Sequence, residues 1–345
     1  MNAFKQDLKK GFYPGVESTG KQIVIAVIGA GAIGQRHLQA LSLMDRPVNL
    51  EVVDPSSEAL QKAERALQEA GSAQQIITVH YHHNLEELPS HLDLAVIAVT
   101  ADVRCAVLED LLSRVTVPYL ILEKVLFQKL SDYVRVRKLL EKNGTKAWVN
   151  CPLRTVACFK LLRRKIEGRP LHYSLCASHL GLGCNSIHHL DLFAFLGGQN
   201  DLTLDTSLLD EEIAAAKRPG FIEFTGTLIG RTGNGGTLRI TSYRRGSVPP
   251  LLTISCEAVR FIYRINEQKA WIAGPWSGWR WRFFPLPFPM QSRLTHLAAG
   301  QILNDGFSDL PAFEESALLH MLLLQAFLQK TGPHRWKEDG LCPIT

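Results

Sequence analysis

A glycine-rich stretch between an apolar run and an amphipathic segment is the strongest constraint on how this chain can fold. Residues 22–31 (QIVIAVIGAG) are rich in β-branched side chains and end in glycines, and residues 32–44 (AIGQRHLQALSLM) have the apolar period of a helix. The order of strand, glycine turn and helix is that of a dinucleotide-binding βαβ unit. The alternative is a glycine turn that serves packing alone.

The same alternation of strand and helix continues along the first half of the chain. Apolar strand-like runs recur at residues 49–55, 76–81, 92–100, 118–125 and 146–154, with helical segments at 56–71, 102–112 and 131–144. Strands that are apolar throughout indicate a parallel sheet covered on both faces. We therefore predict an N-terminal arm at 1–20 and a Rossmann doubly wound domain at 21–150.

The pattern changes near Asn150. An amphipathic helix at 156–168 is followed by alternating runs, and a strong helix covers 311–330; the alternating runs are 221–231, 235–246, 251–265 and 269–274. Alternation predicts an open, mostly antiparallel sheet in an α+β substrate-binding domain at 151–330, followed by a tail at 331–345. The expected fold class is α/β.

Composition excludes several classes of protein. The 345 residues, 46% hydrophobic and 21% charged, suit a folded chain of about two domains, and no apolar run approaches the ~20 residues of a membrane span. The net charge of +5 is too small and dispersed to predict a nucleic-acid partner. Seven cysteines without a CxxC pair indicate reduced thiols and a cytoplasmic location.

The glycine stretch and the next strand predict a cofactor site. Its residues are Gly29, Gly31, Ala32, Ile33 and Gly34, where the first N–H groups of a helix would face a pyrophosphate. Asp54 ends the second strand, where a carboxylate binds the adenosine ribose and repels the extra phosphate of NADP. We therefore expect NAD rather than NADP. The alternative for Asp54 is a cap of the helix at 56–71.

Several stretches together resemble the Gfo/Idh/MocA family, named for glucose-fructose oxidoreductase, inositol dehydrogenase and a rhizopine catabolism protein. The matching stretches are AVIGAGAIGQRH at 26–37, AVT at 98–100, Glu123-Lys124 and HHLDLFAFLGG at 188–198. The resemblance, from about residue 21 to 330, implies a Rossmann domain and a second domain whose open sheet packs subunits into a homodimer or homotetramer. It also implies oxidation or reduction of sugars, polyols or nucleotide sugars with NAD or NADP.

The resemblance assigns site residues as well. Lys124 matches the lysine that lies between nicotinamide and substrate in that family, and His188 and Asp191 match the last two residues of its D-x-x-x-H-x-x-D motif. Thr100 and Glu123 are expected to line the cofactor. Without the resemblance, Lys124 is interpreted as a solvated lysine at the end of a strand. A histidine on an apolar helix face is interpreted as a core residue, and we assign that role to His189.

The chain departs from the family pattern at several positions. Val125 replaces a proline, Ala101 and Cys105 stand where a proline and a histidine are common, and Cys184 and Ser186 replace the motif's first aspartate and a glycine. A thiol, with an ordinary pKa near ~8.5, does not hold a cation as a carboxylate does. Asn185 could still bind a substrate hydroxyl.

Three further features remain open. Asn150 and Arg154 are candidate substrate-binding residues at the domain junction, with an interdomain ion pair as the alternative for Arg154. Residues 271–289 hold four of the six tryptophans, which would stack on a sugar or be buried between subunits. His188, His189 and Asp191 lack a spaced further ligand, so we predict no metal.

The sequence thus predicts an NAD-dependent oxidoreductase that acts on a hydroxyl or carbonyl of a sugar-like substrate, with Lys124 and His188 sharing the proton transfer. Neither a nucleic acid nor a membrane is an expected partner. Two alternatives stay open. One is a nicotinamide-binding sensor or partner protein that has lost its chemistry, which Cys184 would explain. The other is an NADPH-dependent imine or carbonyl reductase.

Overall fold

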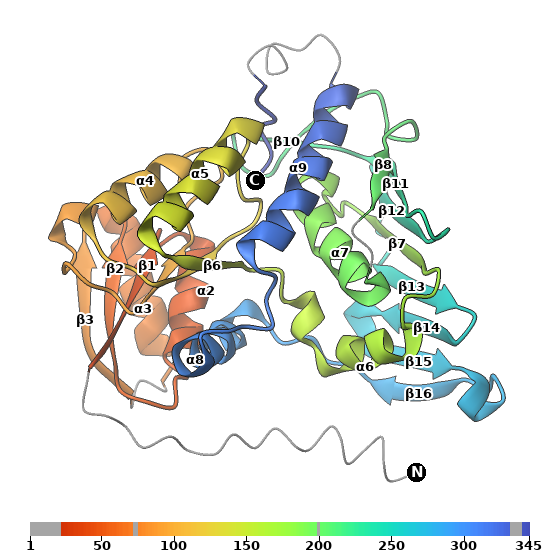
Figure 1. Cartoon of the computed structure of the whole chain (residues 1–345), viewed down its shortest axis with the longest axis horizontal. Helices are drawn as coiled ribbons and strands as arrows, with labels where there is room; N and C mark the ends of the chain where they lie inside the picture. Colours follow the sequence, from red (N-terminus) through yellow and green to blue (C-terminus); the bar gives the residue numbers. More distant parts are fainter. Residues whose placement is uncertain (1–21, 72–74, 199–200, 332–339) are drawn as a thin grey trace.

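The computed structural model describes residues 22–71, 75–198, 201–331 and 340–345, which form two domains side by side (Figure 1). The arm predicted at 1–20 lies outside the described residues, as does most of the tail predicted at 331–345. Within the described residues, no helix is long and apolar enough to cross a membrane.

The first domain is a parallel sheet of six strands in the order β3-β2-β1-β4-β5-β6. The strands are β1 (Ile23–Ile28), β2 (Val48–Val53), β3 (Ile76–His82), β4 (Leu94–Ile97), β5 (Tyr119–Leu122) and β6 (Lys146–Val149). The helices are α2 (Ala32–Leu41), α3 (Ser57–Glu69), α4 (Arg104–Arg114) and α5 (Leu130–Asn143), with a 3-10 turn, η2, at Leu85–Glu87.

Both faces of this sheet are buried, which explains its continuous apolar strands. Val27 of β1 packs in a cluster with residues of α2 and α3, and the adjacent Ala26 packs in a second cluster with residues of α4 and α5. Successive strand residues point to opposite faces, so each strand must be apolar throughout. The predicted Rossmann domain is confirmed.

The second domain is an eight-stranded sheet in the order β16-β15-β14-β13-β7-β12-β11-β8. Its pairings are antiparallel except for β7 with β12, which run parallel. The strands are β7 (His172–Ser178), β8 (Thr203–Asp205), β11 (Gly226–Arg231), β12 (Thr237–Tyr243), β13 (Leu251–Cys256), β14 (Val259–Arg264), β15 (Lys269–Ala273) and β16 (Arg282–Pro285). A separate pair is β9 (Ala214–Ala215) with β10 (Ile222–Glu223). The predicted α/β class with a mostly antiparallel second sheet is confirmed.

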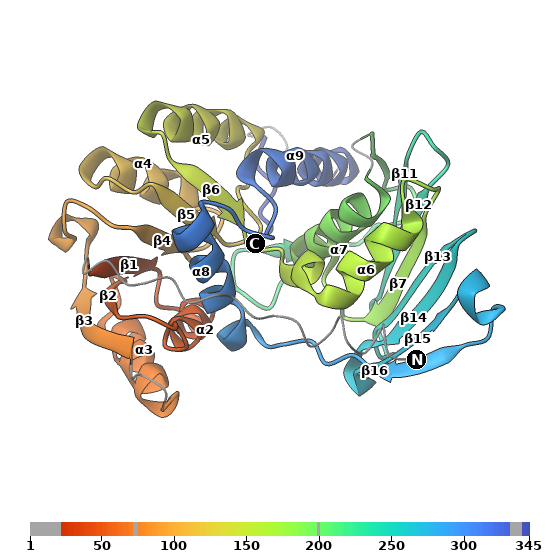
Figure 2. The same cartoon turned by 60° about the horizontal axis from the view of Figure 1, so that its bottom comes forward.

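Helices cover one face of the eight-stranded sheet (Figure 2). They include α6 (Ala157–Ile166) and α7 (Leu182–Gly197). In the part of the chain that is described, no helix covers the opposite face. Pairing places Phe283, Trp271 and Ile262 side by side on neighbouring strands there, and Phe283 is 55% exposed. The 3-10 turns of this domain are η3 (Pro152–Thr155), η4 (Ile265–Glu267), η5 (Pro275–Ser277) and η6 (Gln291–Arg293).

The chain crosses between the domains again after β16. Helix α8 (Thr295–Asp305) packs against α2 of the first domain, although the sequence division placed it in the second. Helix α9 (Phe313–Lys330) then lies alongside α5 and α7 (Figure 1). The tail returns as well, because Leu341 bridges to Lys129 beyond β5. Both domains are therefore completed by C-terminal segments.

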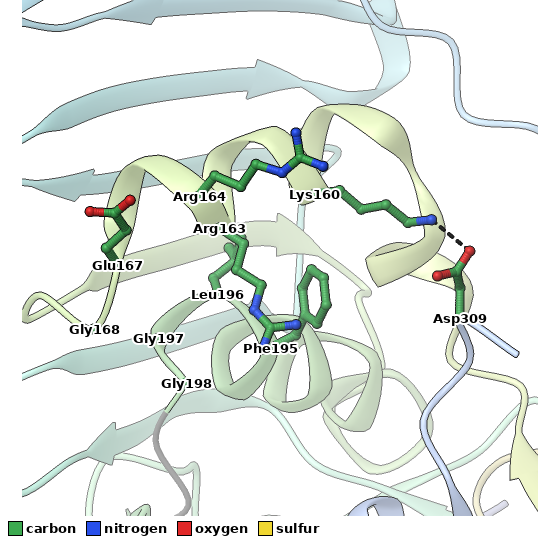
Figure 3. Close-up of a pocket in the computed structure, with 10 residues that line it drawn as sticks. All are labelled: Lys160, Arg163, Arg164, Glu167, Gly168, Phe195, Leu196, Gly197, Gly198 and Asp309. Carbon is green, nitrogen blue, oxygen red and sulfur yellow. Dashed lines mark hydrogen bonds and ion pairs between the residues drawn. The ribbon is translucent and has the colours of Figure 1, made fainter. Parts of the chain in front are cut away.

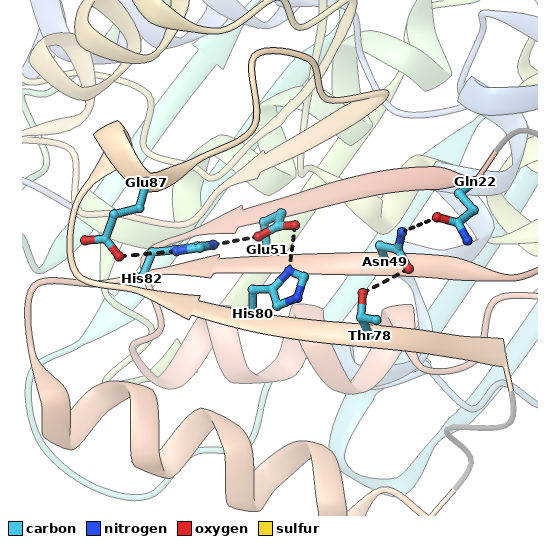
Figure 4. A network of polar contacts seen from close by, with 7 residues as sticks. All are labelled: Gln22, Asn49, Glu51, Thr78, His80, His82 and Glu87. Carbon is cyan, nitrogen blue, oxygen red and sulfur yellow. Dashed lines mark hydrogen bonds and ion pairs between the residues drawn. The ribbon is translucent and has the colours of Figure 1, made fainter.

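A polar network lies on the surface of strands β2 and β3 (Figure 4). The carboxylate of Glu51 contacts His80 Nδ1 at 3.1 Å and His82 Nε2 at 2.6 Å, and Glu87 contacts His82 Nδ1 at 3.4 Å. The side chains of the network satisfy one another's hydrogen-bonding groups. In the described segments no group of three or more such side chains is arranged to hold a metal ion.

Two buried histidines, His189 and His320, and the partly buried His188 predict how stability depends on pH. Burial lowers the pKa of His189 to about 4 and of His320 to about 3, and it lowers the pKa of His188 well below its usual value. The unfolded chain binds protons below pH 6.5 that the folded chain does not, so stability falls as the pH falls from 6.5 towards 4. We expect the free energy of unfolding in urea to drop between pH 7 and pH 5, by about 2 kcal/mol for each histidine that stays neutral. A value that stays constant over this interval would contradict the buried neutral state.

Candidate functional site

The glycine turn after β1 has space and orientation for an anion. Gly29 has φ +98°, and a Cβ there would lie 2.8 Å from the backbone nitrogen of Val99, while a Cβ at Gly34 would lie 1.9 Å from the carbonyl oxygen of Gly29. At Gly31 a Cβ would meet nothing within 4 Å. Gly31 is the N-cap of α2 and supplies no side-chain cap. The first turn of α2, with Ala32 and Ile33, can therefore take a pyrophosphate, as the sequence predicted.

Asp54 links the end of β2 to this turn. Its Oδ2 accepts a hydrogen bond from the backbone nitrogen of Ala30 at 2.8 Å, and its Oδ1 accepts one from Ser56 at 2.9 Å. The N-cap of α3 is Ser56, which accepts from Ala59. The alternative of Asp54 as the cap is therefore wrong. A carboxylate has lone pairs beyond these two contacts, so Asp54 can still bind a ribose hydroxyl.

A buried arginine ties the loop after β4 to the loop after β5. Arg104 is 1% exposed, and its guanidinium donates to the carbonyl oxygens of Val99, Val125 and Leu126. Burial lowers the pKa of Arg104 to about 10. The partly buried Thr100 lies in the first of these loops, and its carbonyl accepts the backbone N–H of Arg104. The two loops that would flank a nicotinamide are thus joined by one side chain.

Five polar side chains from both halves of the chain form a closed ring, which we call the Glu123 ring. His37 Nε2 lies 3.0 Å from Glu123 Oε1. On the other side of the imidazole, His37 Nδ1 lies 2.8 Å from Thr295 Oγ1. Gln291 donates to Thr295 at 3.0 Å, and Asn150 donates both to Gln291 at 3.0 Å and to Glu123. The ring joins α2, the ends of β5 and β6, η6 and α8.

The ring fixes the charge of Glu123 and a proton on His37 Nε2. Burial alone would raise the pKa of Glu123, but the hydrogen bond and charge of His37, then Lys124 and Asn150, lower it to about 2. An ionised carboxylate only accepts hydrogen bonds, so His37 Nε2 carries a proton. Gln291 donates to the Thr295 hydroxyl, which leaves that hydroxyl free to donate to His37 Nδ1.

Lys124 connects the carboxyl edge of the parallel sheet to the second domain. Its Nζ donates to the carbonyl oxygen of Cys184 at 3.1 Å. The peptide bond from Lys124 to Val125 is cis, and Val125 is buried. Carboxyl ends of parallel strands share one edge, so Lys124 after β5 lies on the same edge as Gly29 after β1 and Thr100 after β4. The structure therefore brings the predicted lysine together with the predicted cofactor loop.

The first turns of α7 carry the other predicted site residues. Cys184 and His188 are four residues apart and share one face of the helix. His188 is partly buried, and its Nδ1 is buried with no hydrogen-bond partner in the described chain. Burial and then the charge of Lys124 lower the pKa of His188, so its imidazole stays neutral. Asn185 donates its amide to the carbonyl of Leu180 at the start of the helix.

Asp191 and Arg154 have a different role from the one expected. Arg154 donates to both oxygens of Asp191, at 2.9 and 2.7 Å, and to both oxygens of Glu315, at 2.9 and 2.8 Å. Asp191 therefore neutralises a buried arginine, because two buried charges must pair. Arg154 joins the segment after β6 to α7 and α9, and its guanidinium is hydrogen-bonded by these two carboxylates.

Other predicted features lie apart from this group. His189 faces the core, where its Nδ1 is 2.6 Å from Tyr173 Oη. Trp276, Trp279 and Trp281 of the aromatic segment are 42–47% exposed, on η5 and beside β16. Two cavities, of about 610 Å³ between α6 and α7 (Figure 3) and about 330 Å³ beside Asn150, include neither Lys124 nor His188 in their linings.

Sequence analysis missed several residues that shape the site. His37 stands in the matched stretch after the glycines, three positions beyond Gly34 on the buried face of α2, and that placement was a usable signal. Arg104, followed by four apolar residues at the start of α4, was another. Thr295 and Glu315 lie far along the chain, and only the fold brings them here.

The Glu123 ring predicts the cost of losing its charge. Glu123→Gln leaves His37 and Asn150 without their ionised acceptor, so we expect the free energy of unfolding at pH 7 to fall by about 3 kcal/mol, the value of a pKa lowered to about 2. The contribution is complete above pH 4.5 and fades as the pH falls towards 2. Urea denaturation measures it, with Glu141→Gln on the exposed side of α5 as the matched control. Equal losses of unfolding free energy in the two variants would contradict the role given to the Glu123 ring.

Comparisons with known proteins agree with this geometry. Residues 23–151 match the model of the Gfo/Idh/MocA oxidoreductase family, described as having an NAD-binding Rossmann fold. No curated protein matches the sequence.

Solved structures extend the likeness to nearly the whole chain. An oxidoreductase from Agrobacterium radiobacter in complex with NAD+, L-tartaric acid and magnesium is 15% identical, with a TM-score of 0.68 over 91% of this chain and 98% of that one. UDP-N-acetylglucosamine 3-dehydrogenase GnnA from Acidithiobacillus ferrooxidans is 15% identical, with a TM-score of 0.64 over 89% and 97%. The transcriptional regulator Gal80p from Kluyveromyces lactis is 12% identical, with a TM-score of 0.69 over 91% and 93%.

At these identities the solved structures establish the two-domain fold alone, while the family match covers the domain that holds the glycine turn, Asp54 and Lys124. The N-terminal domain of this chain is therefore similar to the NAD-binding Rossmann domain of the Gfo/Idh/MocA oxidoreductase family.

Proposed function

We propose that this protein is an NAD-dependent oxidoreductase that interconverts a hydroxyl and a carbonyl group on a sugar, polyol or nucleotide sugar. The observation that carries the proposal is the contact of Lys124 Nζ with the Cys184 carbonyl, at 3.1 Å. It brings the amine at the cofactor edge to the turn of α7 that leads to His188. We infer that a proton donor and a proton acceptor share one site between the domains.

The residues present fit a dinucleotide. The glycine turn and the uncapped start of α2 would hold the pyrophosphate, and Asp54 would hold the adenosine ribose. When bound, the nicotinamide would supply the acceptor or donor of a hydride. The carboxylate of Asp54 would repel the extra phosphate of NADP, so we propose NAD as the cofactor.

Lys124 and His188 would handle the proton. In the oxidation direction, the substrate hydroxyl must lose a proton as the carbonyl forms, and a positioned base takes it. His188 is held neutral and has an unpartnered Nδ1, so it can accept a hydrogen bond or a proton. In the reduction direction, the group that took the proton returns it, while a cationic Lys124 would polarise the carbonyl oxygen.

Cys184 favours one second candidate, a cofactor-binding protein without turnover. The thiol stands where the family has a carboxylate, and burial and then Glu223 raise its pKa to about 12. It therefore supplies no charge at neutral pH. The likeness to the regulator Gal80p is compatible with this candidate, although it concerns the fold alone.

The proposal extends to assembly and compartment. We propose a homodimer or homotetramer packed through the uncovered face of the eight-stranded sheet, where exposed aromatic side chains such as Phe283 gather. All seven cysteines are unpaired, which supports a reducing, cytoplasmic environment.

A turnover assay tests the proposed function. The purified protein is incubated with NAD+ and a panel of polyols, aldoses and nucleotide sugars, and with NADH and the corresponding carbonyl compounds, while nicotinamide absorbance is followed. The proposal predicts turnover with at least one hydroxyl-rich substrate and little with NADP+. Cofactor binding with no turnover across the panel would favour the second candidate.

Substitution of the lysine tests its role. Lys124→Met keeps the length of the side chain but removes the amine, so we expect kcat to fall by about 10²- to 10⁴-fold, the usual contribution of a proton-transfer group. The Kd for NADH should change by less than about threefold, because the glycine turn is intact. Lys138→Met on the exposed side of α5 is the matched control. An unchanged kcat would remove Lys124 from the reaction.

A further inference from the structure

The start of α7 is held by a carboxylate from elsewhere in the second domain. Glu223 of β10 accepts the backbone N–H of Gly183 at 2.6 Å through Oε2 and that of Cys184 at 3.1 Å through Oε1. The N-cap of α7, Gly181, supplies no side-chain cap. Glu223 therefore satisfies two N–H groups that would otherwise be unpaired at a helix start, and its charge favours the positive end of the helix.

Glycines at the start of α7 make room for this carboxylate. A Cβ at Gly181 would lie 3.0 Å from Glu223 Oε1 and 2.9 Å from Cys184 Sγ, and a Cβ at Gly183 would lie 2.9 Å from Glu223 Oε2. Any other residue at Gly183 would push against the carboxylate. The sequence Gly-Leu-Gly-Cys and Glu223 are thus fitted to each other.

The strand that carries Glu223 is anchored by the C-terminal residues. Ile222 donates its backbone N–H to the carbonyl of Pro343 at 2.9 Å, and Ile344 packs against Gly183. The segment at 342–344 is itself bound to the first domain, because Cys342 and Gln128 hydrogen-bond through their backbones. The backbone next to Glu223 is therefore anchored, through the C-terminal residues, to the first domain.

From this geometry we propose that Glu223 replaces the carboxylate missing at position 184, as a positioning residue that fixes the Cys184 carbonyl and through it the amine of Lys124. The proposal rests on the proposed function. Two contacts connect the carboxylate to the amine, since Glu223 binds Cys184 N and Cys184 O binds Lys124 Nζ. The family's aspartate would lie on α7 itself, whereas here the charge comes from β10.

Cys184 provides a readout that does not require turnover. Its thiol lies beside the carboxylate, and burial, followed by the charge and hydrogen bond of Glu223, raises its pKa. A thiol reacts with alkylating reagents as the thiolate, so Glu223 should slow its alkylation. Cys176 on β7, which is also partly exposed, serves as an internal reference in the same sample.

The test compares Glu223→Gln, Glu223→Asp and the control Glu257→Gln, an exposed glutamate of the same domain. Alkylation of Cys184 by iodoacetamide is followed by peptide mass spectrometry, and kcat, KM and the Kd for NADH are measured alongside. We expect Glu223→Gln to alkylate at least tenfold faster at Cys184 and at an unchanged rate at Cys176. We also expect its kcat to fall about tenfold or more while the Kd for NADH is kept. Glu223→Asp, which keeps the charge, should recover part of the slow alkylation and part of the kcat of the parent protein.

Two results would overturn the proposal. One is an unchanged alkylation rate at Cys184 in a folded Glu223→Gln variant. The other is a loss of kcat in which Glu223→Asp is as impaired as Glu223→Gln, which would indicate support of the fold without a need for charge. If no substrate is turned over by the parent protein, the proposed function fails, but the alkylation rates still decide whether Glu223 controls position 184.

Discussion

The buried carboxylate of Glu123 is the interaction on which the arrangement of the site depends. It lies at the end of β5, directly before Lys124, and it accepts hydrogen bonds from α2 through His37 and from the end of β6 through Asn150. Thr295 and Gln291 close the ring from a segment more than 140 residues further along the chain. A buried charge is costly unless it is hydrogen-bonded, so these elements are held in one arrangement.

Two further buried charges extend this framework to either side. Arg104 joins the loops after β4 and β5 through carbonyl groups, and Arg154 joins the segment after β6 to α7 and α9 through Asp191 and Glu315. Between these fixed points, Lys124 reaches across to α7. The carboxyl edge of the parallel sheet and the start of α7 thus form the two walls of the proposed site.

The first domain followed from the sequence because its signals are local. Continuous apolar strands, the glycine turn and Asp54 each occupy a short stretch, and the structure placed them as a Rossmann domain. The second domain was predicted only in outline. The run at 251–265 is two strands, β13 and β14, and α8 packs on the other domain. Alternation shows which residues face the core but not where a hairpin turns or to which domain a helix returns.

The site was predictable to the extent that its residues stand in motifs. Lys124 follows the end of β5 and His188 lies in the second turn of α7, and the proton-transfer roles that the resemblance suggested for them stay predictions. The role of Asp191 was not predictable, because its spacing from His188 says nothing about a buried arginine 37 residues earlier that needs its charge. Glu223 gave no signal, since it lies in a two-residue strand outside any motif and acts only through the packing of β10 against α7.

The most direct test of this account is calorimetric titration of the purified protein with NADH and, separately, with NADPH, because the proposed chemistry requires an occupied dinucleotide site and a carboxylate at Asp54 that selects against the extra phosphate. The account predicts binding of NADH in the micromolar range, with NADPH weaker by about tenfold or more. Tighter binding of NADPH would contradict the role given to Asp54. Binding of neither cofactor would contradict the central claim that the glycine turn after β1 holds a nicotinamide dinucleotide.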